Sequence, residues 1–381
     1  MYYNIMSVYY DKYIKYKKKY FKIRNINNSE SGTETDSDSD SDDFPYKKKY
    51  LLNDVIIKKK FTDLKNYKSN IVYDEKYSVK NLENEPDFFK DNIIKYKGRY
   101  TLLVNEYSDY YNYNIISDYF NEECRMKCKR YDTDLSPYDY WITNRDNIIK
   151  HAQQKYKKTD KHSLRESIYE LTHECTSFRP TLIVSIIKLF NAKKILDFSA
   201  GWGDRLIGAI SQDVEYFGVD PNPCLHPNYQ KIIDMFANNN NNNNKYTLIE
   251  SGFETVKLPP KRTYDLIFTS PPYFTLEQYV PTESAEYDKQ SITKFDNIES
   301  WLNNFLYVCI DKGWDKLEVN GHLVIVINNI RDHPNFIKKM IIRMSDKYKE
   351  NIKYLGLISY TERNKFGFKS PQPMWIWEKL S

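Results

Sequence analysis

Two features of one short segment suit a ligand site at the end of a strand. The run ILDFSAGWGD (195–204) reads as an apolar strand ending at Asp197, a turn of small residues, and a helix starting near Asp204. Gly201 and Gly203 permit positive φ angles and a close approach of a ligand to the backbone. The turn has neither the G-x-G-x-x-G spacing of dinucleotide folds nor the lysine of a phosphate-binding loop, so phosphate cradling is disfavoured.

Further polar residues follow at the ends of the next two strands. In GVDPN (218–222), Asp220 ends a strand, where a carboxylate can accept hydrogen bonds from both hydroxyls of a ribose. The alternative for Asp220 is a cap of the following helix, which is common at strand ends. After YTLIE (246–250), the run SGFE (251–254) has groups that could contact an adenine.

The run FTSPPYF (268–274) directly follows another apolar strand. In isolation it is an ordinary Ser-Pro-Pro turn, but α/β folds place their ligands at the carboxyl ends of strands. Because the two prolines restrict the backbone, the Ser270 side chain and the Pro271 carbonyl can point inward as paired acceptors. Tyr273 then offers a flat face for a planar group.

The elements that position these motifs alternate between strand and helix. Alternation with helices of this length implies right-handed crossovers and a mainly parallel sheet. The last two strands lack an intervening helix, so we expect an antiparallel edge pair. The expected strands are 193–198, 216–220, 246–250, 264–270, 322–328, 355–361 and 374–379, and the expected helices are 181–191, 204–211, 226–237, 297–317 and 335–348.

The N-terminal part has a different character. Residues 1–44 are a basic tail followed by the acidic run NNSESGTETDSDSDSDDF, which self-repels and offers nothing to bury, so we expect disorder. Residues 45–100 form a basic Lys/Tyr-rich region. Residues 101–177 are expected to be a helical accessory region, with one or two helices in 101–131, which contains neither glycine nor proline. The expected catalytic domain is 178–381.

Composition narrows the class of protein. The chain has 381 residues and a formal net charge of +5, and its 35 tyrosines accompany many Asn, Lys and Ile, which share A/T-rich codons. The other interpretation of these tyrosines is aromatic stacking on nucleic acid between basic residues. With no run of about 18 apolar residues and no secretory signal pattern, we expect a cytoplasmic protein without a membrane partner. Five cysteines are a sparse, odd set that argues against a disulfide scaffold, and Cys124 with Cys128 lacks a second pair for zinc.

From about residue 178 to 381 the chain resembles class I S-adenosylmethionine-dependent methyltransferases, in the amino-methyltransferase branch that carries Asp/Asn/Ser-Pro-Pro-Tyr/Phe. The longer pattern FSAGWGDRL…GVDPN…FTSPPYFxxExY is similar to that of methyltransferases from phages and large DNA viruses, in which SPxxYW (here 136–141) is part of the module. The resemblance implies a Rossmann-like methyltransferase sheet and S-adenosyl-L-methionine as the cofactor. We expect no bound metal.

The same resemblance implies a role for each motif residue. The loop beneath the methionine portion of the cofactor would be Asp197, Ser199, Ala200, Gly201, Trp202 and Gly203. The ribose would be held by Asp220 with Pro221 and Asn222, and the adenine would be flanked by Phe253 and Glu254. The substrate amino group would be held by Ser270, Pro271, Pro272 and Tyr273, and FRP (178–180) would close over the cofactor's amino-acid end.

These roles describe an N-methyltransferase acting on an exocyclic amino group of a nucleic-acid base, with DNA favoured over RNA. Ser270 suggests a cytosine-N4 product, whereas adenine-N6 stays open because the glycine loop precedes SPPY, unlike in many cytosine-N4 enzymes. Two alternatives are a protein-glutamine methyltransferase and a non-catalytic nucleic-acid-binding protein on the same fold. Substrate contacts are expected from residues 1–177 and from the loops 275–295 and 362–373.

Overall fold

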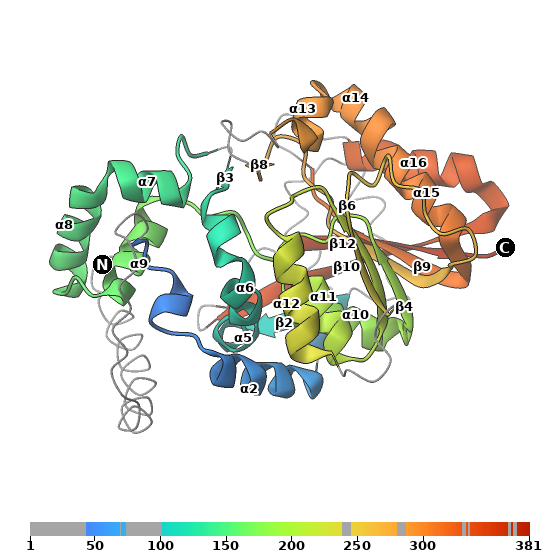
Figure 1. Cartoon of the computed structure of the whole chain (residues 1–381). Coiled ribbons are helices and arrows are strands. Elements are labelled where there is room, and N and C mark those ends of the chain that lie inside the picture. Colours follow the sequence, from blue (N-terminus) through green and yellow to red (C-terminus); the bar gives the residue numbers. More distant parts are fainter. Residues whose placement is uncertain are drawn as a thin grey trace. The chain divides into compact units, whose positions relative to one another are not determined.

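One mixed sheet runs through the chain and carries the sequence motifs at one of its ends (Figure 1). The computed structural model describes residues 43–68, 70–73, 101–130, 132–237, 245–279, 287–329, 333, 336–364, 367–368 and 372–381. Within them the sheet has ten strands in the order β1-β2-β10-β12-β9-β7-β4-β5-β6, with β11 paired to β10. The strands are β1 Asn70–Tyr73, β2 Thr101–Glu106, β4 Lys194–Asp197, β5 Glu215–Asp220, β6 Tyr246–Glu250, β7 Tyr264–Thr269, β9 Leu317–Val326, β10 Ile352–Asn364, β11 Gly367–Phe368 and β12 Gln372–Lys379.

The centre of the sheet is parallel. β4 pairs in parallel with β5 and β7, β5 with β6, and β7 with β9. β12 is antiparallel to both β9 and β10. The Rossmann-like α/β sheet with an antiparallel C-terminal pair, expected from the sequence, is therefore confirmed.

The sheet extends further than the sequence indicated. β2 pairs in parallel with β10, and β1 is antiparallel to β2, so two more strands lie outside the C-terminal pair. The pair is antiparallel as expected, but its expected position at the edge of the sheet is wrong. Of the one or two helices expected in 101–131, Ile115–Met126 is one, whereas Thr101–Glu106 form a strand. The reason is that TLLV is a short apolar run, whose periodicity does not distinguish a strand from a buried helix.

Helices cover both faces of the sheet, because each face presents apolar side chains. One core holds side chains from the first group of helices, and the other core holds side chains from the second group. The first group is α2 Asp54–Lys65, α6 Ile115–Met126, α10 Pro180–Phe190, α11 Asp204–Ser211 and α12 His226–Phe236. The second group is α14 Ile298–Trp301, the π-helix Leu302–Leu306, α15 Tyr307–Lys316 and α16 Phe336–Tyr348.

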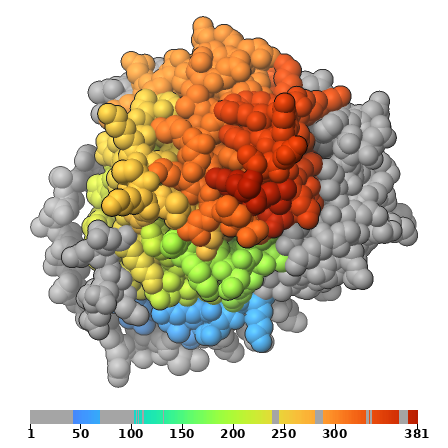
Figure 2. Space-filling model, turned by 90° about the vertical axis from the view of Figure 1, so that its right-hand side faces the viewer, coloured from blue at the N-terminus to red at the C-terminus, as the bar shows by residue number. Residues whose placement is uncertain are grey.

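The N-terminal residues pack into the same unit as the sheet. Phe44–Ser381 form one compact unit. On the face shown in Figure 2, α2 (blue) lies beside the green segment that contains α10, below the orange and red C-terminal third. The carbonyl of Lys65 at the end of α2 accepts a hydrogen bond from Gln212 Nε2 at 3.3 Å. The expected disordered tail, apart from its last two residues, lies outside the described residues.

Three further helices form a small module with its own core. They are α7 Pro137–Thr143, α8 Arg145–Tyr156 and α9 Lys161–Leu171. Trp141, Ile148 and Ile168 from these helices cluster with Phe44 and Tyr46. SPxxYW therefore lies in this core: Ser136 caps α7 by accepting from Asp139 N at 3.1 Å, and Trp141 is buried.

A buried ionic network ties α6, α9 and residues 47 and 174 together. Asp118 pairs with Arg125 at 2.6 Å and with Lys47 at 2.5 Å. Arg165 pairs with Glu122 at 3.0 Å. Glu174 pairs with Arg125 at 2.6 Å. The network therefore holds against α6 the start of the segment 174–179, which leads into α10. Among the described residues no helix is long and apolar enough to cross a membrane.

Candidate active site

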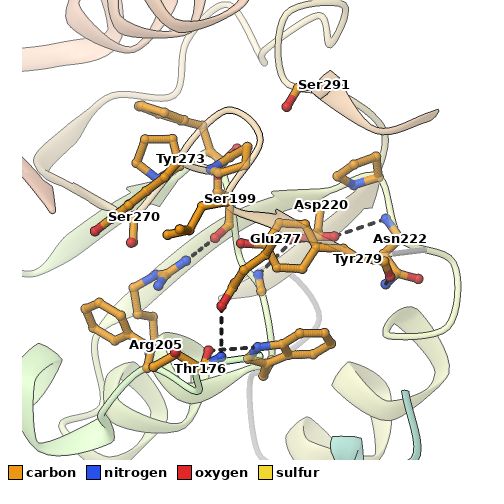
Figure 3. A pocket seen from close by; sticks show the side chains of 18 of the residues that line it. Thr176, Ser199, Arg205, Asp220, Asn222, Ser270, Tyr273, Glu277, Tyr279 and Ser291 are labelled. Carbon is orange, nitrogen blue, oxygen red and sulfur yellow. Dashed lines mark hydrogen bonds between the residues drawn. The ribbon is translucent and has the colours of Figure 1, made fainter. Parts of the chain in front are cut away.

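A cavity of about 420 Å³ opens at the carboxyl ends of β4, β5 and β7 (Figure 3). Its size lies within the range of small-molecule and cofactor sites. Of the residues expected from the sequence, most line it. They are Ser199, Gly201, Trp202, Asp220, Pro221, Asn222, Phe253, Glu254, Ser270, Pro271, Pro272 and Tyr273. Three expected residues, Asp197, Ala200 and Gly203, are not part of its lining.

The glycine loop forms one wall because its backbone turns sharply between β4 and α11. Gly201 and Gly203 have φ angles of +58° and +85°, which side-chain-bearing residues rarely adopt. A Cβ at Gly203 would lie 2.9 Å from Ile232 Cδ1 of α12. The Ala200 amide donates to the Val219 carbonyl at 3.0 Å, which fixes the loop against β5.

Asp197 lies behind this wall, where it holds the loop in place. Its side chain is fully buried, and its Oδ2 accepts from Arg205 Nε at 2.6 Å and from the Tyr216 hydroxyl at 2.6 Å. Its Oδ1 accepts from the Ser199 amide at 3.1 Å. The Arg205 guanidinium also donates to the Ser199 carbonyl and stacks on the Phe178 ring at 4.7 Å. The acid that ends β4 is thus a positioning residue for the loop.

Asp220 faces the cavity from the end of β5. Its Oδ2 accepts from the Gly201 amide at 2.8 Å, and its Oδ1 accepts from the Asn222 amide at 3.0 Å. Burial raises the pKa of the Asp220 carboxyl. Each oxygen keeps a second lone pair for a hydroxyl donor, so the carboxylate can bind a vicinal diol while joining the two loops.

An aromatic and an acid form the next part of the lining. Phe253 is stacked on Phe198 with ring centroids 5.3 Å apart. The Lys312 ammonium lies 5.2 Å from the Phe253 centroid and donates to the Phe253 carbonyl at 2.6 Å. The Glu254 Oε1 accepts from Lys294 at 2.8 Å, whereas its Oε2 is buried without a hydrogen-bond partner. A buried carboxylate oxygen left unpaired in a cavity wall is suited to a donor on a ligand.

Ser270–Tyr273 form the opposite wall (Figure 3). Burial raises the pKa of the Tyr273 phenol, and its hydrogen-bonding partner Ser270 acts in the other direction. The Tyr273 hydroxyl donates to the Val326 carbonyl of β9 at 3.2 Å, which anchors the ring. Phe274 follows at a φ of +50°, a strained value for an aromatic residue, with its side chain buried against Trp301.

Residues that the motifs did not identify close the cavity. Glu277 and Gln278 form β8, which pairs with β3 (Lys129–Arg130). Glu277 Oε1 accepts from the Thr176 amide at 3.0 Å, and the Thr176 carbonyl accepts from Trp202 Nε1 at 3.2 Å. Burial raises the pKa of the Glu277 carboxyl. The spacing of FxxExY was the only sequence signal for this residue, and it carried no role.

Other lining residues come from segments distant in sequence. Phe178 and Arg179, the first residues of FRP, line the cavity, and Pro180 begins α10. From the 275–295 loop the lining includes Tyr279 and Gln290, whose Oε1 accepts from the Tyr279 amide at 2.7 Å. The 362–373 loop contributes Glu362 and Gln372, while residues 365–366 and 369–371 lie outside the described residues.

The cysteines differ from expectation. Cys124 of α6 and Cys224, two residues after Asn222, form a disulfide with Cα atoms 6.1 Å apart. A bridge across 100 residues of sequence depends on the packing of α6 beside the end of β5, which cysteine spacing does not reveal. Cys128 and Cys175 are buried. In the described part of the chain, no three His, Cys, Asp or Glu side chains are grouped to hold a metal ion.

Asp204, the first residue of α11, has an unusual environment behind the loop. Its Oδ1 lies 2.5 Å from Ser117 Oγ of α6, which also lies 2.9 Å from the Asn114 carbonyl. Its Oδ2 is buried with no hydrogen-bond partner. Burial raises the pKa of the Asp204 carboxyl to about 7. A neutral Asp204 can donate from Oδ1 to Ser117 while Ser117 donates to the Asn114 carbonyl, and it leaves no negative charge on the unpartnered Oδ2.

We expect the contribution of Asp204 to the free energy of unfolding to fall by about 4 kcal/mol as pH rises from about 4 through 7. Over that range the folded chain retains a proton on Asp204 that the unfolded chain releases, so rising pH stabilises the unfolded state relative to the folded state. Asp204→Asn should remove this fall and make the chain more stable than wild type at pH 8. Urea unfolding at pH 5 and pH 8 measures the difference, with Asp63→Asn on the exposed side of α2 as control. Equal pH dependence in Asp204→Asn and wild type would show that Asp204 is ionised.

No family model and no curated protein matches this chain. The chain is similar to several solved structures. An rRNA methylase from Streptococcus thermophilus is 13% identical, with 54% of this chain and 100% of that chain covered and a TM-score of 0.32. The tRNA (m1A58) methyltransferase TrmI from Aquifex aeolicus is 14% identical, with 54% and 71% covered and a TM-score of 0.32. A SAM-dependent methyltransferase from Agrobacterium tumefaciens is 15% identical, with 53% and 61% covered and a TM-score of 0.34. The Rossmann-like fold is therefore assigned from the strand order of this chain and not from these similarities.

Proposed function

We propose that the chain is an S-adenosylmethionine-dependent N-methyltransferase that acts on an exocyclic amino group of a nucleic-acid base, with DNA favoured over RNA. The observation that carries this proposal is the single cavity that joins the glycine loop, Asp220, the Phe253–Glu254 pair and Ser270–Tyr273. These are the motifs on which the resemblance to amino-methyltransferases rests, and they lie in four separate stretches of sequence.

The cavity fits this cofactor in three respects. Gly201 leaves room for a ligand along the loop, because a Cβ added there would have no neighbouring atom closer than 3.7 Å. Asp220 presents two carboxylate oxygens suited to the ribose hydroxyls. The unpaired Glu254 Oε2 suits the amino group of adenine. S-adenosylmethionine supplies a methyl group on a sulfonium, a good leaving group, so the protein need not supply a strong base.

The residues of the opposite wall would position the substrate. The Ser270 hydroxyl and the Pro271 carbonyl would accept hydrogen bonds from the NH2, which directs its lone pair toward the methyl group. The Tyr273 ring, anchored to β9 by its hydroxyl, would stack on the base. Positioning of this kind supplies most of the rate when the leaving group is good. A base in duplex DNA must first be flipped out of the stack.

Cofactor binding is tested first. Calorimetry should detect binding of S-adenosylmethionine and of S-adenosylhomocysteine to the purified chain. Asp220→Asn should weaken both by roughly ten- to a hundredfold, because hydrogen bonds to a charged group contribute about 1.5–3 kcal/mol. Asp234→Asn, on the solvent side of α12, is the control. If neither ligand binds, the methyltransferase proposal fails.

Tyr273→Ala should lower kcat/KM by roughly ten- to a hundredfold, since stacking of a base on an aromatic ring contributes about 1–3 kcal/mol. Cofactor affinity should stay near wild type. Tyr273→Phe removes the hydroxyl, with its contacts to Ser270 and to the Val326 carbonyl, but keeps the ring and should retain most activity. Ser270→Ala should lower turnover without changing cofactor affinity. A Tyr273→Ala enzyme with wild-type kcat/KM would contradict stacking.

The substrate is identified by transfer of tritiated methyl from the cofactor to pools of DNA, RNA and protein, followed by nucleoside analysis. Label on N4-methylcytosine or N6-methyladenine supports the proposal. Label on a protein glutamine and on no nucleoside would replace the substrate while leaving the fold and cofactor in place.

A further inference from the structure

The Glu277 carboxyl lines the cavity without a counter-ion. Its residue is 8% exposed, and no Lys or Arg side chain in the described part of the chain forms an ion pair with it. Arg125, which acts on it through space, is paired with Glu174 at 2.6 Å. Arg130, which does the same, is paired with Asp132 at 3.1 Å. Burying a carboxylate without a cation is costly, so a cation on a ligand would bind favourably there.

The three other carboxyls that line the cavity are already engaged in other ways. Asp220 accepts hydrogen bonds from two loop amides at the position expected for the ribose. Glu254 is paired with Lys294 at 2.8 Å at the position expected for the adenine. Glu362 is paired with Arg179. Among the lining residues, Glu277 is therefore the acid best suited to a positively charged group of a ligand.

Glu277 lies at the end of the cavity expected to hold the methionine portion of the cofactor. Its Oε1 accepts from the Thr176 amide at 3.0 Å, as Figure 3 shows. The Thr176 carbonyl accepts from Nε1 of Trp202, in the glycine loop, at 3.2 Å. Phe178, two residues after Thr176, begins the segment expected to close over the amino-acid end. Asp197, the acid expected beneath this portion, lies behind the loop and outside the lining.

We propose that Glu277 binds the α-ammonium group of the cofactor's methionine portion. The inference rests on the proposed function and assigns one contact of that same site. The carboxyl accepts from the Thr176 amide and from the Tyr279 hydroxyl, and a carboxylate has about four lone-pair sites, so acceptor capacity remains for an ammonium group. Such a hydrogen bond between two charged groups is stronger than one between neutral groups.

This contact would also connect the cofactor to the residues that hold the substrate. Glu277 follows Tyr273 closely in sequence, and the Leu276 amide donates to the Tyr273 carbonyl at 3.1 Å. The pairing of β8 with β3 holds the Glu277 backbone in place. A cofactor bound to Glu277 would therefore help to hold the segment that carries the Tyr273 ring.

The test uses Glu277→Gln in the full chain, because glutamine keeps an acceptor for the Thr176 amide and removes the charge. Calorimetry measures the affinity for S-adenosylhomocysteine and for 5′-methylthioadenosine, which contains the same adenosine but has neither the α-ammonium nor the carboxylate. Glu277→Gln should weaken S-adenosylhomocysteine roughly ten- to a hundredfold. It should bind 5′-methylthioadenosine like wild type, which also shows that the site is folded.

Two control variants separate this contact from the rest of the site. Asp220→Asn should weaken both ligands, because both contain the ribose. Glu299→Gln, the same change at an exposed position of α14, should leave both affinities unchanged.

The desamino analogue of S-adenosylhomocysteine, in which hydrogen replaces the α-amino group, tests the partner of Glu277 directly. Wild type should bind this analogue more weakly than S-adenosylhomocysteine, and Glu277→Gln should lose most of that preference. If circular dichroism shows that Glu277→Gln is unfolded, Glu277→Asp takes its place. Aspartate withdraws the charge by one methylene, so it should selectively weaken S-adenosylhomocysteine.

Three results would overturn the inference while leaving the proposed function in place. They are an unchanged affinity of the variant for S-adenosylhomocysteine, an equal weakening of S-adenosylhomocysteine and 5′-methylthioadenosine, and a wild type that binds the desamino analogue as tightly as S-adenosylhomocysteine. If wild type binds neither S-adenosylmethionine nor S-adenosylhomocysteine, the proposed function itself fails.

Discussion

A chain that begins at Asp43 should melt at the temperature of the full-length protein, whereas one that begins at Lys47 should be largely unfolded at 25 °C. Phe44 and Tyr46 are 0% and 1% exposed, with ring centroids 4.4 Å apart, and the Phe44 ring contacts Trp141 edge-on at 6.0 Å. Deleting one large aromatic ring from a core costs about 3–5 kcal/mol. Two such losses approach the 5–15 kcal/mol by which a domain is stable.

Thermal melts followed by circular dichroism compare the two truncations. Phe44→Ala in the full-length chain is the matched variant and should lose about 3–5 kcal/mol, measured by urea unfolding. Destabilisation by removal of residues 1–42 would show that the acidic run contributes to the fold. The sequence predicts that the tail ends at residue 44. Because Phe44 is buried, the longest truncation expected to leave the fold intact ends at residue 42.

Arg205→Met should destabilise the chain by about 3–5 kcal/mol, because it leaves the fully buried Asp197 carboxylate without its cation. The same change removes the contact to the Ser199 carbonyl, so the loop loses a support and cofactor affinity should fall as well. Urea unfolding gives the first quantity and calorimetry with S-adenosylhomocysteine gives the second.

The double variant Asp197→Asn/Arg205→Met separates charge from packing. With both charges removed, we expect a smaller loss than the sum of the two single variants, because no charge is left buried alone. Tyr216→Phe removes a single hydrogen bond to Asp197 and should cost less than Arg205→Met. Additive single losses would contradict the assignment of Asp197 as the partner that makes Arg205 necessary.

Much of the site could be predicted from local sequence. Gly201 and Gly203 occupy backbone conformations that favour glycine, and the two prolines after Ser270 restrict the backbone in the same way wherever they occur. Because strand ends of a parallel sheet meet at one edge, Asp220, Phe253 and Tyr273 could be placed together without a structure. Twelve expected residues line the cavity for this reason.

What a residue contacts across the fold could not be predicted in this way. Asp197 was expected beneath the cofactor, yet its carboxylate is taken up by Arg205 and Tyr216 behind the loop. The role of Glu277 follows only from its hydrogen bond to the Thr176 amide in the folded chain. Thr176 belongs to a segment that is held by buried ion pairs with α6 and α9. β2 depends on a parallel partner, β10, near the other end of the chain.

The division has a physical cause. Backbone preferences of Gly and Pro and the periodicity of apolar residues act between neighbours in sequence. Short segments therefore suffice to predict the α/β alternation, the positive-φ turn and the Ser-Pro-Pro-Tyr turn. Burial of a charge, pairing of a strand and closure of a cavity depend on which distant side chains exclude water from the group. The roles of Asp197, Phe44, Asp204 and Glu277 were therefore set by packing between segments far apart in the chain.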